Sequence, residues 1–576
     1  MGLADFPTEL QSMILGELLH ADGQESELED RGVTLASDHN FFLNGVGENA
    51  TIRRRRHQRP GDHLRSARLV CRQWNELAVK HLFREVSLLH CRHVIRTQME
   101  TEQFLQRRED PGGRSGGRRY NFKMWNAMAS SETVRKAARG VNIYSGPHHY
   151  RIDREVAGNE YDSEMAFRHR ETWRSWELGS WKEFEDAISR ISDLPGLKEV
   201  SVWFSKFVFC KGTMAQLEIE DGQMDIWDHW PDCELISTRF YTLREVFKAM
   251  ALHKARNSNP IKSLSIRNLA NAPFPELLSP GSPLLTIAKD ITKLRLDMTH
   301  EPISTFPSGN TAPEWTRGIN ETERRDFEPF LQKRFLSHFV DSLTWLHLSF
   351  RHAWGVAPGT FDGRGLAFPN LRTLSLHNFQ IAHHDHFDWV LNQTSLENLY
   401  LDHCAIVVLI HLADDQVKRW GVNTEDWDKY PAGAWGFGTG RVYRFLGTWE
   451  TLFDHMITYL PCLVDFRMAY TDWRSAPRDC FELPDPGCPL SPMRYDILSL
   501  VMGERAWNET RNRRDDNGDI MMGDNNKGPH TRTQDDWYPP MPKPNRARET
   551  KLGDASSWNH LHQVIQERRR RREAFL

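Results

Sequence analysis

The strongest cluster of metal-ligand residue types in the chain consists of His383, His384, Asp385 and His386. Imidazole nitrogens and carboxylate oxygens are common ligands of Zn²⁺ in proteins. Adjacent residues on a strand or helix point in different directions, however, so they rarely converge on one ion. We therefore expect no metal at these four residues.

Two other segments have compositions that resemble ligand-binding loops. The GFGTG run contains Gly436, Gly438 and Gly440, but no Lys-Ser/Thr pair follows it as in a phosphate-binding loop, so we expect a turn. In the segment DDNGDIMMGD, aligning Gly518 with the turn glycine of a calcium loop puts Arg513 at the first carboxylate position. That substitution excludes a calcium loop, because the first ligand would be a cation.

The cysteines also lack a recognisable ligand or nucleophile pattern. There are 8 of them, without a CxxC pair, and the chain has no GxSxG or HExxH motif. We expect reduced thiols that mostly pack in the core, in the cytoplasm, the nucleus or both. The sequence thus predicts no catalytic residue, no cofactor and no metal ligand. The cysteines are at positions 71, 91, 210, 233, 404, 462, 480 and 488.

Size and charge narrow the class of protein. With 576 residues, the chain is too long for one ordinary core, so we expect two or more units. Its 74 Lys and Arg residues against 78 Asp and Glu residues give a net charge of −4, and this balance does not indicate a nucleic-acid-binding protein as a whole. The sequence has no apolar run of 18 residues, so we expect no membrane span. The 20 Trp residues argue against wholesale disorder.

Apolar residues at helical spacing occur in two segments near the N-terminus, residues 5–20 and 63–89. In the first, Leu10, Ile14 and Leu18 form one stripe after Pro7, which suits the first turn of a helix. A helical bundle of this size cannot bury all of its apolar surface alone. Either the remainder of the chain or a second protein must therefore cover part of it.

These two segments resemble the halves of an F-box, and the chain resembles a fungal F-box protein with divergent leucine-rich repeats. Phe6-Pro7 stands where that family usually has Leu-Pro, and Leu69-Val70-Cys71 followed by Trp74 matches its second half. The resemblance implies that the helices bind a Skp-type adaptor, which connects to a cullin and a ubiquitin-charged enzyme. The expected adaptor-binding residues are Pro7, Leu10, Ile14, Leu18, Leu69, Val70, Trp74 and Leu77.

The sequence departs from the family between these halves. Residues 22–62 form a polar insertion that includes Arg53 to Arg56, whereas the halves usually lie a few residues apart. Lengthening a loop by about three doublings adds only about 2 kcal/mol of closure entropy, so a surface insertion is tolerable. The Arg run is interpreted as a solvated loop, with a nuclear-import signal as the alternative.

The middle of the chain repeats a pattern of apolar residues spaced as LxxLxL, and helical segments precede several copies. Ile261 to Ile291 spans 30 residues, and Leu371 to Leu396 spans 25, near the length of a leucine-rich repeat. A strand and a helix per unit are typical of that repeat, whereas an ordinary α/β domain with a parallel sheet is the alternative. The copies begin at Phe83, Leu197, Ile261, Ile291, Leu343, Leu371, Leu396 and, more weakly, Leu463, with another strand expected at Val141 and Ile143.

The expected fold class is α/β, with a helical F-box followed by an irregular leucine-rich-repeat-like solenoid of alternating strands and helices, and disordered insertions and tail. The expected domains are residues 1–89, 120–505, a disordered segment at 506–556 and a basic helix at 557–576. The last helix should have Trp558, Leu561 and Ile565 on one side. Its Arg568 to Arg572 run is interpreted as solvated, with an import signal or a contact with nucleic acid as the alternatives.

The function expected from this resemblance is a non-catalytic substrate receptor of a cullin-based, SCF-type ubiquitin ligase. The F-box would bind the Skp-type adaptor, and the repeats would bind an unknown target protein. Two alternatives stay open. One is an F-box scaffold protein that acts without ubiquitin transfer, and the other is an enzyme whose site is assembled from distant residues of an α/β domain.

Overall fold

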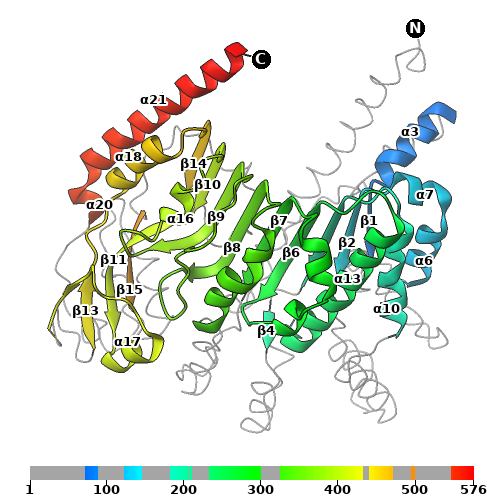
Figure 1. Ribbon diagram of the computed structural model, residues 1–576, viewed down its shortest axis with the longest axis horizontal. Coiled ribbons are helices and arrows are strands. Elements are labelled where there is room, and N and C mark those ends of the chain that lie inside the picture. The colour runs from blue at the N-terminus through cyan, green and yellow to red at the C-terminus, as the bar shows by residue number, and fades with distance from the viewer. Residues whose placement is uncertain are drawn as a thin grey trace, which may run out of the picture.

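The computed structural model describes residues 72–88, 122–145, 182–204, 207–209, 233–299, 325–431, 440–470, 494–499 and 546–575. The first half of the predicted F-box, the insertion at 22–62 and residues 63–71 lie outside the described residues, as do residues 506–545 of the segment predicted to be disordered. In the described part, the fold is mixed α/β around one large, mostly parallel sheet (Figure 1). This agrees with the predicted fold class at the level of α/β.

Among the described residues, nine strands form a parallel array and lie side by side (Figure 1). They run from the end that carries helix α3 (Arg72–Leu82) to the end that carries helix α21 (Lys551–Phe575). Each strand pairs in parallel with the next. In spatial order they are β1 (Glu85–Leu88), β2 (Gly140–Tyr144), β3 (Glu199–Trp203), β6 (Ser263–Ala270), β7 (Lys293–Thr299), β8 (Trp345–Trp354), β9 (Thr373–Ile381), β10 (Asn398–Asp402) and β14 (Asp465–Ala469).

The predicted LxxLxL copies fall into register across these strands. The second apolar position of each copy lies opposite its counterpart, so Leu264 pairs with Leu294, and Leu294 pairs with Leu346. A hydrogen-bond pattern also repeats at the residue before each strand, whose carbonyl accepts from two N–H groups of the next unit. The carbonyl of Thr344, for example, accepts from the N–H groups of Arg372 at 2.9 Å and Thr373 at 3.1 Å. The same pair of hydrogen bonds occurs before the first strand, where the Arg84 carbonyl accepts from the N–H groups of Arg139 and Gly140.

This register brings β1 into the array, although its residues fall inside the range predicted for the F-box. Val86 and Leu88 are buried in the same core as Val141 and Ile143 of β2. The strand expected at Val141 and Ile143 is therefore confirmed as β2. The strand expected from the weakest copy is confirmed too, because Phe466 of β14 pairs with Leu399 of β10.

The sheet branches beyond β9. The first half of β9 pairs with β10, while Gln380 and Ile381 pair with β11 (Ala405–Leu412). Strand β11 also pairs with β15 (Tyr495–Ser499) in parallel and with β13 (Arg441–Arg444) in the antiparallel sense. Strand β13 pairs with the short β12 (Asp428–Lys429). A separate two-stranded sheet joins β4 (Phe207–Phe209) and β5 (Cys233–Leu235).

Helices pack against one side of the strand array and enclose the core. Leu264 and Leu294 of the sheet belong to the same buried cluster as Phe247 of α13 and Ile287 of α14. Ser282 caps α14 by accepting a hydrogen bond from the N–H of Leu285, and Pro283 occupies its first turn. These helical elements are α6 (Phe122–Ser130), α7 (Glu132–Ala137), α10 (Lys182–Ser189), η3 (Arg190–Asp193), α13 (Ile236–Arg256), η4 (Pro275–Leu278), α14 (Pro283–Ala288), residues 325–330 with η5 (Leu331–Phe335) and η6 (Leu336–Phe339), and α16 (Asp388–Leu391).

The predicted helices before the strands are confirmed at α10, α13 and α18 (Trp449–Tyr459). The branch contains α17 (Asp414–Trp420), where the side chains of Trp420 and the nearby Trp427 are buried. Trp427 donates to the Ala382 carbonyl at 2.5 Å. These two aromatic residues therefore belong to the same core as the sheet.

The C-terminal prediction needs a correction. Helix α20 (Arg546–Glu549) and the first turns of α21 lie within the segment 506–556 that was predicted to be disordered. They are ordered because the fully buried Asp554 accepts hydrogen bonds from Arg494 and Tyr495. Tyr495 is the first residue of β15, and Arg494 directly precedes it. The polar composition of the segment hid this buried network.

Helix α21 lies along α18 at the end of the array (Figure 1). Trp558, Leu561 and Ile565 are buried on one side, as predicted, and Trp558 packs edge-on against Phe453 and Phe466. The helix covers the last strand of the sheet with its apolar side. It thus supplies the cover that the final unit of a stacked array needs.

The arginine run of α21 is only partly solvated, which corrects the prediction of a solvated run. Arg568 donates to the carbonyls of Leu460 at 2.8 Å and Ile457 at 2.7 Å, at the C-terminal end of α18. Arg572 forms an ion pair with Glu397 at 2.8 Å. The carbonyls at a helix C-terminus lack intrahelical donors, so the guanidinium satisfies them.

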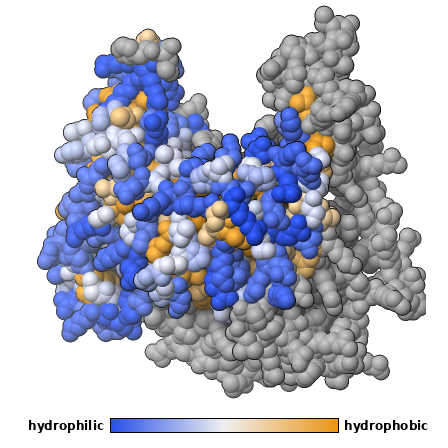
Figure 2. All heavy atoms as spheres, turned by 45° about the vertical axis from the view of Figure 1, so that its right-hand side comes forward, coloured by the Kyte–Doolittle hydropathy of each residue, from blue (hydrophilic) through white to orange (hydrophobic). Residues whose placement is uncertain are grey.

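The outer surface is mostly hydrophilic in the view of Figure 2, with smaller hydrophobic areas between. Among the described residues, the helices include none that combines the length and the apolar composition needed to cross a membrane.

Candidate functional site

The strand array presents a polar face on the side opposite the helices. Successive side chains of a strand point to opposite sides, so the residues between the core positions line this face. The polar face is defined here by Tyr144, Trp203, Arg267, Arg295, Asp297, Trp345, His347, Ser375, His377, Tyr400, Asp402, Asp465 and Arg467. It extends from β2 to β14.

An aromatic and cationic group lies at the β2 end of the polar face. The rings of Tyr144 and Trp203 are stacked with centroids 5.4 Å apart. The guanidinium of Arg267 lies 3.7 Å from the centroid of Trp203. All three side chains are half-buried. A flat, partly exposed surface of this kind is typical of protein-binding patches, which are enriched in Tyr, Trp and Arg.

A charged network occupies the centre. Asp297 accepts hydrogen bonds from Arg295 at 3.0 Å and from His347 at 3.1 Å, and His347 also contacts the Ser375 hydroxyl at 3.0 Å. Burial by itself favours the neutral acid, but the hydrogen bond from His347 and the charge of Arg295 hold the pKa of Asp297 well below its usual range. The network therefore stays charged at neutral pH.

Tyr400 links two residues at the β14 end. Its hydroxyl donates to Asp465 at 2.9 Å, and Arg467 lies over its ring at 5.5 Å from the centroid. Arg467 and Asp465 also form an ion pair at 3.2 Å. Polar contacts thus continue along the face from one strand to the next.

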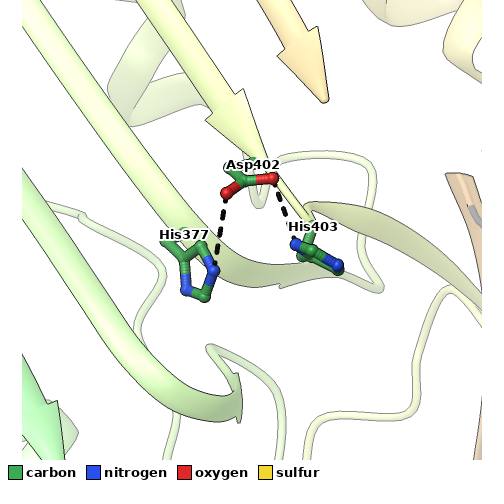
Figure 3. A group of neighbouring side chains, drawn as sticks. All are labelled: His377, Asp402 and His403. Atoms are coloured by element: carbon green, nitrogen blue, oxygen red, sulfur yellow. Dashed lines mark hydrogen bonds and ion pairs between the residues drawn. The ribbon is translucent and has the colours of Figure 1, made fainter. Parts of the chain in front are cut away.

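Figure 3 shows a further group between these two, formed by His377, Asp402 and His403. His377 ends up beside Asp402 because the two residues are paired in the register of β9 and β10. Nε2 of His377 lies 3.6 Å from Oδ2 of Asp402, and Nδ1 of His403 lies 3.1 Å from Oδ1. Burial lowers the pKa of His377 to about 4, although the charge of Asp402 opposes the shift. His377 is therefore neutral at physiological pH.

The side chains of the consecutive residues His383 to His386 do not point to one common site. His383 forms an ion pair with Asp426 at 2.6 Å, Asp385 pairs with Arg364, and His386 contacts the Phe361 carbonyl at 2.8 Å. The expectation that adjacent side chains point to different partners is confirmed. The cluster at His377, Asp402 and His403 was missed, because His377 lies 25 residues before Asp402 and only the register of β9 and β10 brings them together.

Two of the eight predicted adaptor-binding residues fall within the described part of the chain. Trp74 and Leu77 lie on α3, and Leu77 is buried, with 7% of its surface exposed. The other six, Pro7, Leu10, Ile14, Leu18, Leu69 and Val70, lie outside the described residues. Their contact with an adaptor stays a prediction.

No family model matches this chain, and no curated protein matches it.

Proposed function

We propose that the chain is the substrate-recognition subunit of a cullin-based, SCF-type ubiquitin ligase. In this proposal, residues 5–20 and 63–83 bind a Skp-type adaptor, and the strand array binds a target protein. The chain itself supplies no reacting group. It acts by holding lysines of the target near the ubiquitin-charged enzyme, which raises their effective concentration.

The junction between α3 and β1 is the observation that carries the proposal. Helix α3, the last part of the F-box-like sequence, ends at Leu82, and β1 begins at Glu85. The Arg84 carbonyl between them accepts from the N–H groups of Arg139 at 2.7 Å and Gly140 at 2.9 Å. The helix is thus connected to the array without a flexible linker, as positional catalysis requires.

The repeat assignment is supported by the unit at residues 396–404. Leu396, Leu399, Leu401 and Cys404 have the spacing LxxLxLxxC of a leucine-rich repeat. The Cys404 thiol lies 3.4 Å from the carbonyl of Leu376, in the preceding unit, and is buried. In β9, Asn378 instead donates to the Phe350 carbonyl of its preceding unit at 2.8 Å. Side-chain bonds between successive units are what a stacked array requires.

The polar face is the surface that we assign to the target. It combines aromatic side chains, Arg and ion pairs, which favour a protein partner with mixed polar and apolar contacts. The other side of the sheet is occupied by the helices and the core. Among cell compartments, the cytoplasm and the nucleus are where such a ligase would act.

The proposal is tested by recovery of the adaptor with the tagged full-length chain. We expect Pro7→Ala/Leu10→Ala to reduce the recovered Skp-type adaptor by at least about tenfold, because both residues lie in the predicted docking helix. Lys289→Ala, exposed at the end of α14 and outside the two predicted adaptor-binding segments, is the control and should recover the adaptor at the wild-type level. Undiminished adaptor recovery with the double variant would rule out this docking surface.

A further inference from the structure

We propose that His377, Asp402 and His403 bind one divalent transition-metal ion of the Zn²⁺ class. The inference goes beyond the ligase proposal and does not depend on it. Two imidazole nitrogens and a carboxylate oxygen are a common ligand set for this class of ion. All three candidate ligand atoms lie within 4.8 Å of one another.

The spacing of the ligand atoms fits one ion. Zn–N and Zn–O bonds of about 2.0–2.1 Å in a tetrahedral site place neighbouring ligand atoms about 3.3 Å apart. The two distances from Asp402 start from different carboxylate oxygens, 3.6 Å from Oδ2 to His377 and 3.1 Å from Oδ1 to His403, and they lie on either side of that value. The two rings lie on opposite sides of the carboxylate (Figure 3), and we infer that they turn toward a shared ion when one binds.

Hydrogen bonds behind His377 orient it as a ligand. Its Nδ1 lies 3.2 Å from the Phe350 carbonyl, to which a protonated Nδ1 donates. The two N–H groups of the neighbouring Asn378 amide donate to the carbonyls of Phe350 at 2.8 Å and Arg351 at 3.4 Å. Nδ1 also lies 3.0 Å from Nδ2 of Asn378. In the tautomer that donates from Nδ1 to the Phe350 carbonyl, Nε2 directs its lone pair at Asp402. Metal-bound imidazoles typically have such a carbonyl on the second nitrogen.

One nitrogen of His377 faces a carboxylate oxygen of Asp402. With the ring proton on Nδ1, the Nε2 lone pair and this oxygen are both acceptors, and they lie 3.6 Å apart. A bound cation favours both groups at once.

His403 is held in place by its backbone. It has a φ of 54°, in the left-handed region where non-glycine residues are uncommon, and its N–H donates to the Ala469 carbonyl at 2.8 Å. The equivalent residues of β6 and β9 are Asn268 and Asn378, also at positive φ. Asn and His both occur in this conformation more often than most residues, and His403 takes the position directly after β10.

Burial and open coordination positions complete the argument. The exposed fractions of the side chains are 15% for His377, 9% for Asp402 and 3% for His403, so bulk water competes weakly for the ion. Three protein ligands leave at least one position open. That position lies on the polar face, where water or a side chain of a bound protein can fill it.

The test is equilibrium dialysis of the full-length chain against Zn²⁺ after removal of metal with a chelator. We expect one tightly bound ion per wild-type chain, and at least about tenfold weaker binding in His377→Gln and Asp402→Asn. The control His383→Gln removes a His–Asp pair of similar closeness outside the cluster and should bind like the wild type. Co²⁺ in place of Zn²⁺ gives a visible absorption band that reports the ligand field directly.

His377→Gln decides the matter if Asp402→Asn does not fold, because the His377 ring is partly exposed and its replacement is milder. Equal Zn²⁺ binding by wild type and His377→Gln would overturn the site, as would the lack of saturable binding by the wild type. In either case the three residues would be a hydrogen-bonded ion pair without a metal.

Discussion

The Asp554 carboxylate of α21 accepts a hydrogen bond from Nε of Arg494 at 2.8 Å, and both side chains are almost completely buried. The same carboxylate accepts from the hydroxyls of Tyr495 at 3.1 Å and Thr550 at 2.7 Å. It also accepts from the N–H of Glu450, at the start of α18, at 3.0 Å. One carboxylate therefore joins β15, α18 and α21, and holds the terminal helix on the array.

Removing this charge should release the terminal helix. We expect Asp554→Asn to lower the free energy of unfolding by about 3–5 kcal/mol, because it leaves the buried Arg494 without its counter-charge. The urea midpoint, followed by circular dichroism, measures the loss. Glu549→Gln removes half-exposed ion pairs of α20 at 3.8 and 3.9 Å and should cost less than about 1 kcal/mol. Similar losses for the two variants would contradict the anchoring role.

A turn before β9 should be intolerant of any side chain at Gly363. This residue has a φ of 62°, and a Cβ there would overlap the buried ring of Trp389. We expect Gly363→Ala to lower the free energy of unfolding by at least about 2 kcal/mol more than Gly281→Ala. Gly281 also has positive φ, at 81°, but open space surrounds its Cβ position, so the pair isolates the steric term. Equal thermal unfolding midpoints for the two variants would show that the Trp389 ring moves aside to accommodate the Cβ.

The buried imidazole of His386 should make stability depend on pH. Burial, followed by the charge of His383, lowers its pKa to about 4, and its Nδ1 accepts the Ala382 N–H at 3.3 Å, which protonation would break. The unfolded chain, with an ordinary pKa of 6.5, thus binds the proton more readily. The contribution of His386 to the free energy of unfolding, roughly 3 kcal/mol, is fully present above about pH 6.5 and is lost as the pH drops toward 4.

The comparison of variants isolates this contribution. His386→Gln should give a shallower loss of the urea midpoint between pH 6.5 and 4 than the wild type, since one of the depressed histidines is gone. The exposed His384 provides the control His384→Gln, which should keep the wild-type slope. Parallel curves for wild type and His386→Gln would contradict the assignment.

Target binding should depend on the aromatic and cationic end of the polar face. Arg267→Ala removes the guanidinium stacked on Trp203, and we expect at least about tenfold less target captured after crosslinking, with Skp-type adaptor recovery unchanged. Arg267→Lys should rescue binding only in part, because an ammonium does not stack as a planar guanidinium does. Lys289→Ala, exposed at the end of α14, should leave capture unchanged. Full target recovery with Arg267→Ala would move the binding surface elsewhere.

Much of the array could be predicted because its signal is local. The spacing of Leu371, Leu374 and Leu376 indicates a strand with one buried side, and the same pattern in the next unit predicts a neighbour. The helix expected around Phe247 is likewise visible from its apolar residues. Register then follows, because a slip of one residue would turn Leu374 away from the core.

The branch and the polar clusters could not be predicted, because their signal is not local. Asp554 and Arg494 lie 60 residues apart in a polar stretch that resembles disorder. His377 and Asp402 are joined only by the pairing of β9 with β10. The consecutive His383 to His386 run is the more visible pattern in the sequence, although neighbouring side chains point apart. The polar positions within the repeated LxxLxL pattern, where His, Arg and Trp recur, were the available signal.

The central claim is that this chain connects a ligase core to a target, and co-purification tests it most directly. The tagged full-length chain is expressed with a Skp-type adaptor and a cullin, and the bound proteins are quantified. We predict that adaptor and cullin elute together with the wild type and that both are lost with Pro7→Ala/Leu10→Ala. Adaptor without cullin would contradict the ligase and favour a scaffold, and the absence of both would contradict the F-box itself.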